Sequence, residues 1–288
     1  MSGEPLVAWE NEAAIPSGKS ESSINVTASQ LPSSNLHALL DRIGHEHFPG
    51  HELCEPRPGV VAAQFFQARL TSAFQPIVRA AGGVMGHHAL VRVNGDGGDT
   101  AAPWKVFAQA SDDANLVQLD RLCRTVHALN YFPSAPAGNF LFLNIDRRLL
   151  NFIAADHGMY FEAILAKMGV SPGRVVIVMP ASASDDPVTF VRAAISYRIR
   201  GYRVLAQLRA TTEADLEHLF LADPHYAAID GPAPERSDEI APIVAALTRR
   251  GIGSVARRIE SEAQAQAARD AGFNFLQGWH YAVPGARP

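Results

Sequence analysis

Four side chains of types that commonly bind zinc lie close together near the N-terminus. They follow the spacing His-x-His-x3-His-x2-Cys and are His45, His47, His51 and Cys54. Imidazole and thiolate groups are good zinc ligands, but this spacing matches no closed structural zinc site. The intervening Pro49 and acidic residues favour a loop, so we expect a connecting segment here, with a zinc site as the alternative.

A pair of histidines, His87 and His88, lies within the apolar run 84–93. Successive side chains of a strand point to opposite faces. We therefore expect one of the two rings to point inward, and we favour this interpretation over a pair of metal ligands.

These residues need a framework, and strand-like runs alternate with helix-like segments from about Val60 onward. The predicted strands span 73–79, 84–93, 140–145, 175–179, 203–208, 226–229, 253–256 and 273–276. Such alternation implies parallel strands that are covered by helices. Seven or eight units of this kind favour closure into an α/β, TIM-like (β/α) barrel.

Two of the predicted helices have clear boundaries. Asp186-Pro187 predicts the start of one helix and Gly201 lies just past its end. The apolar side chains of this helix that we expect to face the core are Val188, Val191, Ile195 and Ile199. A later helix is expected to bury Ile240, Ile243, Val244 and Leu247.

Composition divides the chain into three parts. Residues 1–34 are poor in large apolar residues and predict a disordered tail. Residues 35–59 predict a short helix and a connector, and residues 60–288 the barrel. The apolar face of the short helix comprises Leu36, Leu39, Leu40 and Ile43.

Overall composition excludes several classes of protein. The net charge is −4 and the basic residues are scattered, which argues against nucleic-acid binding. Cys54 and Cys123 are the only cysteines, so no disulfide framework is expected. No signal peptide and no membrane-spanning run is recognisable, and we expect a cytoplasmic protein.

Short motifs at the predicted strand ends follow one another in an order that points to a family. Residues 74–78 read Phe-Gln-Pro-Ile-Val, and residues 86–92 read Gly-His-His-Ala-Leu-Val-Arg. Further motifs are Leu119-Asp120-Arg121, Leu143-Asn144-Ile145, Ala228-Ile229-Asp230, residues 255–260, Gln264, residues 272–278 and Pro284. Together they resemble the EAL family of cyclic-di-GMP phosphodiesterases, with His88 in place of the signature glutamate.

The resemblance also shows which catalytic groups have been replaced. EAL enzymes use two divalent cations, which need several carboxylate ligands in close proximity. The asparagine ligand is retained as Asn144 and one later glutamate as Glu260. The other family positions carry His88, Val178, Ala181, Gln207, Leu208, Ala228 and Arg257. We therefore expect no metal, no cofactor and no catalytic residue, so that the chain is not an enzyme.

Residues that hold the nucleotide in EAL domains are better retained. The resemblance implies that Arg92 contacts a phosphate, that Gln75 lines the pocket and that Asp120 binds a guanine edge. Arg257 and Arg258 are candidates to replace the positive charge of the cations. The expected ligand site is Gln75, Arg92, Asp120, Asn144, Arg257, Arg258 and Gln277.

Each of these residues also has a structural alternative. Asp120 can pair with Arg124 along a helix, Arg92 can form a structural ion pair, and Gln75 can satisfy backbone groups at a strand end. Asn144 and Gln277 can be polar residues that maintain the fold. Arg257 and Arg258 can be a solvated charge pair.

The sequence thus predicts a regulatory protein with a degenerate EAL domain. The resemblance implies a cyclic-di-GMP receptor that acts on an unidentified protein partner in bacterial motility, adhesion or biofilm control. The alternative is a protein-interaction module that no longer binds nucleotide.

Overall fold

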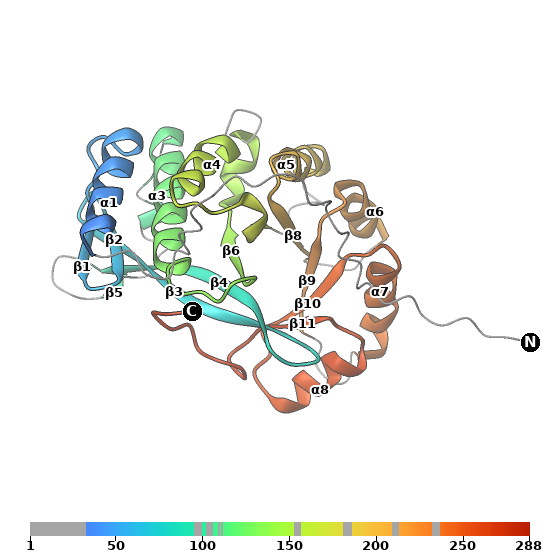
Figure 1. Ribbon diagram of the computed structural model, residues 1–288. Coiled ribbons are helices and arrows are strands. Elements are labelled where there is room, and N and C mark those ends of the chain that lie inside the picture. Colours follow the sequence, from blue (N-terminus) through green and yellow to red (C-terminus); the bar gives the residue numbers. More distant parts are fainter. Residues whose placement is uncertain are drawn as a thin grey trace, which may run out of the picture.

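The computed structural model describes residues 33–94, 100–101, 106–108, 110, 112–152, 157–180, 186–208, 213–231 and 237–288. Its centre is a closed barrel of mixed strands, as Figure 1 shows, which confirms the predicted TIM-like fold. The barrel strands are β3 (Ala68–Arg79), β4 (Val84–Asn94), β6 (Phe140–Asn144), β7 (Val175–Met179), β8 (Arg203–Gln207), β9 (Tyr226–Asp230), β10 (Gly253–Arg257) and β11 (Phe275–Leu276).

One barrel strand does not run parallel to its neighbours. β3 pairs antiparallel with both β4 and β11, whereas the pairings from β4 through β6 to β11 are parallel. Residues 80–83 are too few for a helical crossover, so β3 and β4 form a hairpin. Its turn uses Gly82 and Gly83, whose φ angles of 104° and 84° suit glycine. The prediction of parallel strands was therefore wrong for β3.

A small sheet extends the barrel on its N-terminal side. The added elements are α1 (Ser33–His47), β1 (Leu53–Arg57), β2 (Val60–Phe65) and β5 (Thr100–Ala101). β2 pairs with the first half of β3, and α1 buries Leu39, Leu40 and Ile43 as predicted. The segment expected to be a connector thus contains strand β1. The predicted tail, apart from the first residues of α1, lies outside the described residues.

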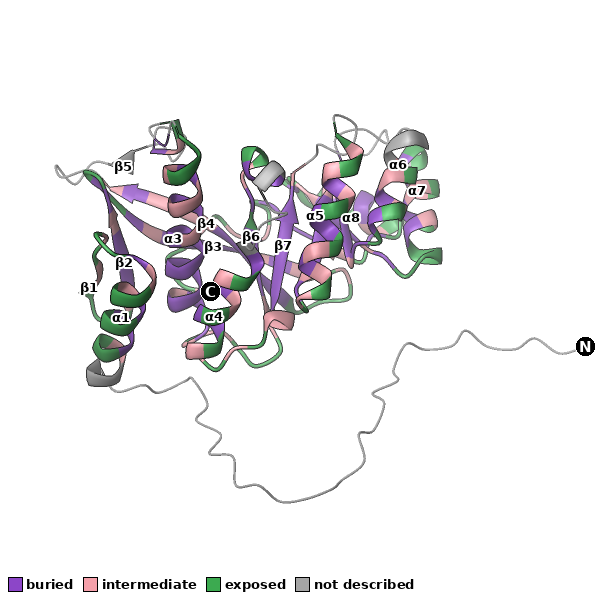
Figure 2. Cartoon of the chain, turned by 90° about the horizontal axis from the view of Figure 1, so that it is seen from above, coloured by how far each residue is buried: buried purple, intermediate pink, exposed green. Residues whose placement is uncertain are grey.

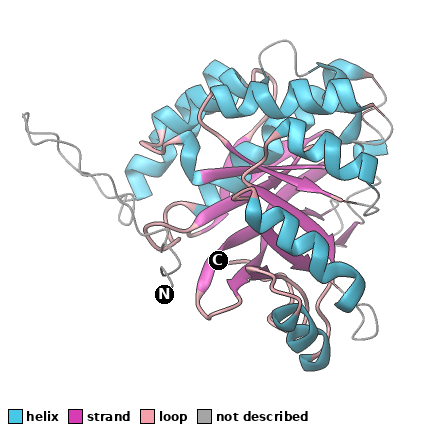
Figure 3. Ribbon diagram, turned by 90° about the vertical axis from the view of Figure 1, so that its right-hand side faces the viewer, coloured by secondary structure: helices cyan, strands magenta, loops and turns pink. Residues whose placement is uncertain are grey.

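Helices surround the barrel on its outside, as Figure 3 shows. They are α3 (Asp113–Tyr131), α4 (His157–Lys167), α5 (Pro187–Ile199), α6 (Glu213–Ala222), α7 (Ser237–Arg249) and α8 (Glu262–Asp270), with short 3-10 turns at Arg147–Phe152 and Pro172–Arg174. Among the described residues, no helix has both the length and the apolar character needed to cross a membrane.

The core has two layers. Inside the barrel, apolar side chains from opposite strands meet: Ile77, Met85, Phe142, Val176, Val178, Leu205, Tyr226, Ala228 and Val255. A larger apolar layer lies between the strands and the surrounding helices. In Figure 2 the strands are accordingly mostly buried, while the outward faces of the helices are exposed.

Helix α5 is oriented differently from the prediction. Asp186 caps its N-terminus by accepting a hydrogen bond from the backbone N–H of Thr189, as the Asp-Pro start predicts. The face turned to the barrel, however, consists of Phe190, Ala193, Ala194 and Tyr197. Val188 and Ile199 are 67% and 81% exposed. The helix is apolar on most sides, so periodicity alone did not determine which face is buried.

Candidate functional site

Polar side chains replace the apolar interior where the parallel strands end. Two residues after buried Phe142, β6 ends with Asn144, and two residues after Val255, β10 ends with Arg257. Because alternate residues share one face of a strand, these side chains belong to the top of the barrel interior. The carboxyl ends of barrel strands are where active and binding sites lie in this architecture.

A chain of hydrogen bonds connects side chains of β3, β4 and β6 with Gln277, which directly follows β11. His88 Nε2 lies 2.9 Å from Asn144 Oδ1, and His88 Nδ1 lies 3.2 Å from the amide nitrogen of Gln277. The same Gln277 nitrogen donates to Gln75 Oε1 at 2.9 Å, and Gln75 donates to the carbonyl of Ala282 at 3.1 Å. Since an amide nitrogen can only donate, Nδ1 accepts and Nε2 carries the proton.

His88 is therefore neutral and fully engaged. Its pKa is lowered to about 4: burial is the main cause and nearby Arg257 adds to it, while the hydrogen bonds with Asn144 and Gln277 oppose the shift. The ring points into the barrel as predicted for one of the two histidines. His87 points outward instead, toward the hydroxyl group of Tyr131.

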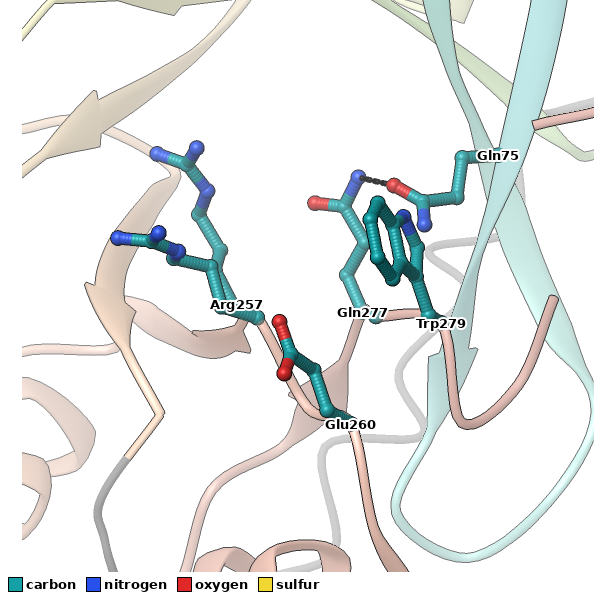
Figure 4. Close-up of a pocket in the computed structure, with 7 residues that line it drawn as sticks. Gln75, Arg257, Glu260, Gln277 and Trp279 are labelled. Carbon is teal, nitrogen blue, oxygen red and sulfur yellow. Dashed lines mark hydrogen bonds between the residues drawn. The ribbon is translucent and has the colours of Figure 1, made fainter. Parts of the chain in front are cut away.

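A pocket of about 230 Å³ lies beside this network. Its lining comprises Gln75, Arg257, Arg258, Glu260, Gln277, Gly278 and Trp279. In Figure 4 the carboxylate of Glu260 points into the space near Arg257 and Gln277, and the exposed indole of Trp279 lies beside Gln277. Small-molecule sites generally have about 300–1,000 Å³, so this pocket has room for part of a larger ligand.

Two arginines give the pocket a positive side. Arg258 Nη1 lies 3.3 Å from Asp230 Oδ2 in an exposed ion pair. Arg257 is half-buried, and within the described residues its guanidinium group has no hydrogen-bond acceptor. Burial lowers the pKa of Arg257, Asp230 opposes that shift and Arg258 adds to it. The pocket lining thus carries two guanidinium groups and one carboxylate, that of Glu260, and the carboxylate of Asp230 lies beside Arg258.

Asp120 lies in the interior instead of at the pocket. Its Oδ2 is 2.7 Å from Arg124 Nε and its Oδ1 is 3.3 Å from Arg124 Nη2, and both side chains are less than 10% exposed. Arg124 also donates to the hydroxyl group of Tyr197. The structural alternative for Asp120 therefore describes its contacts in this structure.

The structure brings together part of the predicted ligand site. Gln75, Arg257, Arg258 and Gln277 line the pocket, and Asn144 joins them through His88. Arg92 lies on β4 opposite Thr71 and is half-buried. Neither Arg92 nor the buried Asp120 belongs to the pocket lining.

Sequence reasoning missed two contributions to the site. It treated His88 as a lost ligand and did not foresee that the ring would form hydrogen bonds with two side chains, Asn144 and Gln277. It also assigned no role to Trp279, whose exposed indole ring lies at the pocket. An aromatic residue directly after Gln277-Gly278 was the available signal, because large exposed aromatic side chains often mark binding sites.

The histidine–cysteine cluster near the N-terminus does not converge. His45 and His51 line a separate pocket beside α1, and the His51 ring stacks on Phe65. His47 contacts Tyr160 edge to face, and Cys54 lies on β1. In the described part of the chain, no three His, Cys, Asp or Glu side chains are grouped as a metal site requires.

Comparison with known proteins decides the family. The model of the EAL domain matches residues 61–284, well over half of the chain. The chain belongs to the EAL domain family. No curated protein matches it by sequence.

Solved EAL structures share the fold at low identity. The cAMP- and cyclic-di-GMP-bound EAL enzyme Bd1971 has a TM-score of 0.63 at 17% identity, covering 75% of this chain and 62% of its own. YkuI from Bacillus subtilis, in complex with cyclic di-GMP and calcium, has 0.64 at 22%, covering 75% and 56%. The cyclic-di-GMP-bound EAL domain of FimX from Pseudomonas aeruginosa has 0.64 at 16%, covering 88% and 97%. This chain thus spans less than two thirds of Bd1971 and YkuI.

Few of the described residues at the positions that the resemblance assigns to the EAL cation pair carry a side-chain oxygen: Asn144, Gln207 and Glu260 do, whereas His88, Val178, Leu208, Ala228 and Arg257 do not. Divalent cations of this kind need several carboxylate or other oxygen ligands. Asn144 Oδ1 already accepts a hydrogen bond from His88, Val178 and Ala228 are apolar and buried, and Arg257 is cationic. The family positions at Ala181 and at the loop 209–211 lie outside the described residues.

Proposed function

We propose that this protein is a non-catalytic receptor for cyclic di-GMP that acts on a protein partner in the bacterial cytoplasm. The observation that carries the proposal is the hydrogen bond between His88 and Asn144. It engages the oxygen that the resemblance assigns to metal binding, and it puts a neutral ring where the signature glutamate would lie.

Energetics supports the absence of turnover. Hydrolysis of a phosphodiester requires an enzyme to lower the barrier by well over ~10 kcal/mol. The cation pair supplies much of that stabilisation in two-metal enzymes, and most of the described positions that the resemblance assigns to that pair carry no side-chain oxygen here. The receptor does not need it, because binding requires only that the ligand be held.

Retained contacts support nucleotide binding. Gln75 and Gln277 remain at the pocket with Arg257 and Arg258, which are suited to phosphate, and Trp279 offers an aromatic face. The solved EAL domain of FimX is a precedent for a cyclic-di-GMP complex on this fold. Motility, adhesion and biofilm control are the processes that the resemblance implies for the regulated pathway.

One titration tests the proposal. Cyclic di-GMP is added to the purified chain in the calorimeter, once with EDTA and once with Mg²⁺, while chromatography monitors the linear dinucleotide. We expect saturable binding in both buffers and no linear product. Turnover would refute the non-catalytic assignment, and absence of binding in both buffers would refute the receptor.

A second candidate function is a protein-interaction module without nucleotide binding. The outward face of α5 favours it, because Val188, Ile195 and Ile199 form an exposed apolar stripe at helical spacing. The buried Asp120–Arg124 pair is consistent with it, since Asp120 is not free to contact a guanine. This candidate predicts no heat of binding in the titration and loss of partner binding in Ile199→Ser, with Glu217→Ser on neighbouring α6 as the exposed control.

A further inference from the structure

The loop after β10 has an unusual backbone for its sequence. Arg258 has a φ of 59°, in the left-handed region that glycine adopts freely and arginine rarely. Residues held in this region persist only where the surroundings impose them, and they concentrate at functional sites. The strained backbone at this position therefore suggests that the Arg258 side chain has a function.

The surroundings hold this loop firmly. The backbone N–H of Gly231 donates to the carbonyl of Arg257 at 2.5 Å, and the N–H of Ile259 donates to the carbonyl of Gln277 at 3.1 Å. A Cβ atom on Gly278 would lie only 1.9 Å from the carbonyl oxygen of Ile259. The loop and the end of β11 are thus in direct backbone contact, which fixes where the neighbouring side chains begin.

The two guanidinium groups on this loop have few partners. Arg258 has only the exposed, 3.3 Å contact with Asp230 among the described residues, and Arg257 has no ion pair with them. Both side chains line the same pocket with Gln75 and Gln277. Guanidinium groups bind phosphate through paired N–H donors, and their positive charge does not depend on pH in the physiological range.

We propose that Arg257 and Arg258 bind a phosphate group of the ligand directly, as a permanent replacement for divalent cations. This inference rests on the proposed function and deepens it, because it states which charge holds the ligand. Two consequences follow: affinity does not require a divalent cation, and affinity falls as salt screens the guanidinium groups. The left-handed backbone at Arg258 is retained because a glycine there would remove one of the two charges.

Calorimetry with cyclic di-GMP in EDTA tests the inference on four proteins. They are the wild type, Arg257→Met, Arg258→Gly and the control Arg249→Ala, which removes the same charge from the exposed end of α7. We expect at least tenfold weaker binding by the two pocket variants and unchanged binding by the control. The melting temperature of Arg258→Gly should equal or exceed that of the wild type, because glycine adopts this backbone without strain.

The outcomes separate this inference from the proposed function. If the wild type binds no cyclic di-GMP in EDTA or in Mg²⁺, the receptor itself is refuted. If the wild type binds only with Mg²⁺, or if both pocket variants bind as tightly as the wild type, the receptor stands and the arginine pair is refuted. A clear fall in the melting temperature of Arg258→Gly would show that this arginine is kept for stability, which contradicts the role given to it here.

Discussion

The Asp120–Arg124 pair and the Asp230–Arg258 pair join the same residue types in opposite surroundings. The first lies on the buried face of α3, with two contacts of 2.7 and 3.3 Å. The second lies at the exposed barrel mouth with one contact of 3.3 Å. A buried pair cannot exchange its partner without leaving a charge in the core, whereas an exposed pair exchanges with water at little cost. Proximity to a family motif therefore does not tell which arginine or aspartate is free for a ligand.

The largest effect is expected from breaking the buried pair. Asp120→Ala leaves the Arg124 charge in the interior without its carboxylate, and should lower the free energy of unfolding by about 3–5 kcal/mol. Urea denaturation followed by circular dichroism measures the change. The double variant Asp120→Ala/Arg124→Leu should recover much of the loss. If the single variant were as stable as the wild type, the pair would not be the structural element described here.

Acidification should destabilise the protein through two buried neutral histidines: His88 at the barrel mouth, and His127 on α3, whose Nδ1 lies 2.7 Å from Ser72 Oγ of β3. Burial lowers the pKa of His88 to about 4 and that of His127 to about 3, against about 6.5 in an unfolded chain. The unfolded state thus takes up protons first, and the free energy of unfolding falls as the pH drops below about 6.5. Each histidine contributes roughly 1.4 kcal/mol per pH unit.

Denaturation curves between pH 6.5 and 5 measure this slope. His88→Gln keeps a hydrogen-bonding side chain that does not titrate. Its free energy of unfolding should therefore fall less steeply with decreasing pH than that of the wild type, by the contribution of one histidine. Equal slopes for the two proteins would mean that His88 is already protonated, or equally solvated, in the folded state.

The smallest effect is expected from breaking the exposed pair. Asp230→Ala should change the free energy of unfolding by less than about 1 kcal/mol. It should also tighten binding of cyclic di-GMP about two- to fivefold, because Arg258 no longer has a competing carboxylate. Weaker binding by this variant would place Asp230 among the groups that hold the ligand, and would remove the contrast between the two pairs.

Sequence patterns gave the barrel strands to within a few residues, because each is a short apolar run between turn signals. They did not give the direction of β3, although only residues 80–83 separate it from β4. They also failed for α5, where apolar residues occur on both faces and the alanines 193 and 194 allow close packing on the strands. Burial of this kind depends on the partner surface, which no local pattern contains.

For the site, the sequence identified the residues but not their mutual contacts. Gln75 and Gln277 are 202 positions apart, and their hydrogen bond depends on closure of the barrel. Both interpretations of Asp120 were open until the structure showed Arg124 alongside it. The polarity of His88 was visible from the start, but its partners on β6 and after β11 were not.

The absence of a side chain at Gly278 limits how this protein can respond to a ligand. Any larger residue there would collide with the backbone of Ile259, so only glycine lets the chain after β11 approach the loop after β10 this closely. A side chain at position 278 would therefore push these two segments of the pocket lining apart. The same pocket also contacts the segment that follows, because Gln75 donates to the carbonyl of Ala282 and Phe74 of β3 pairs with Gly285.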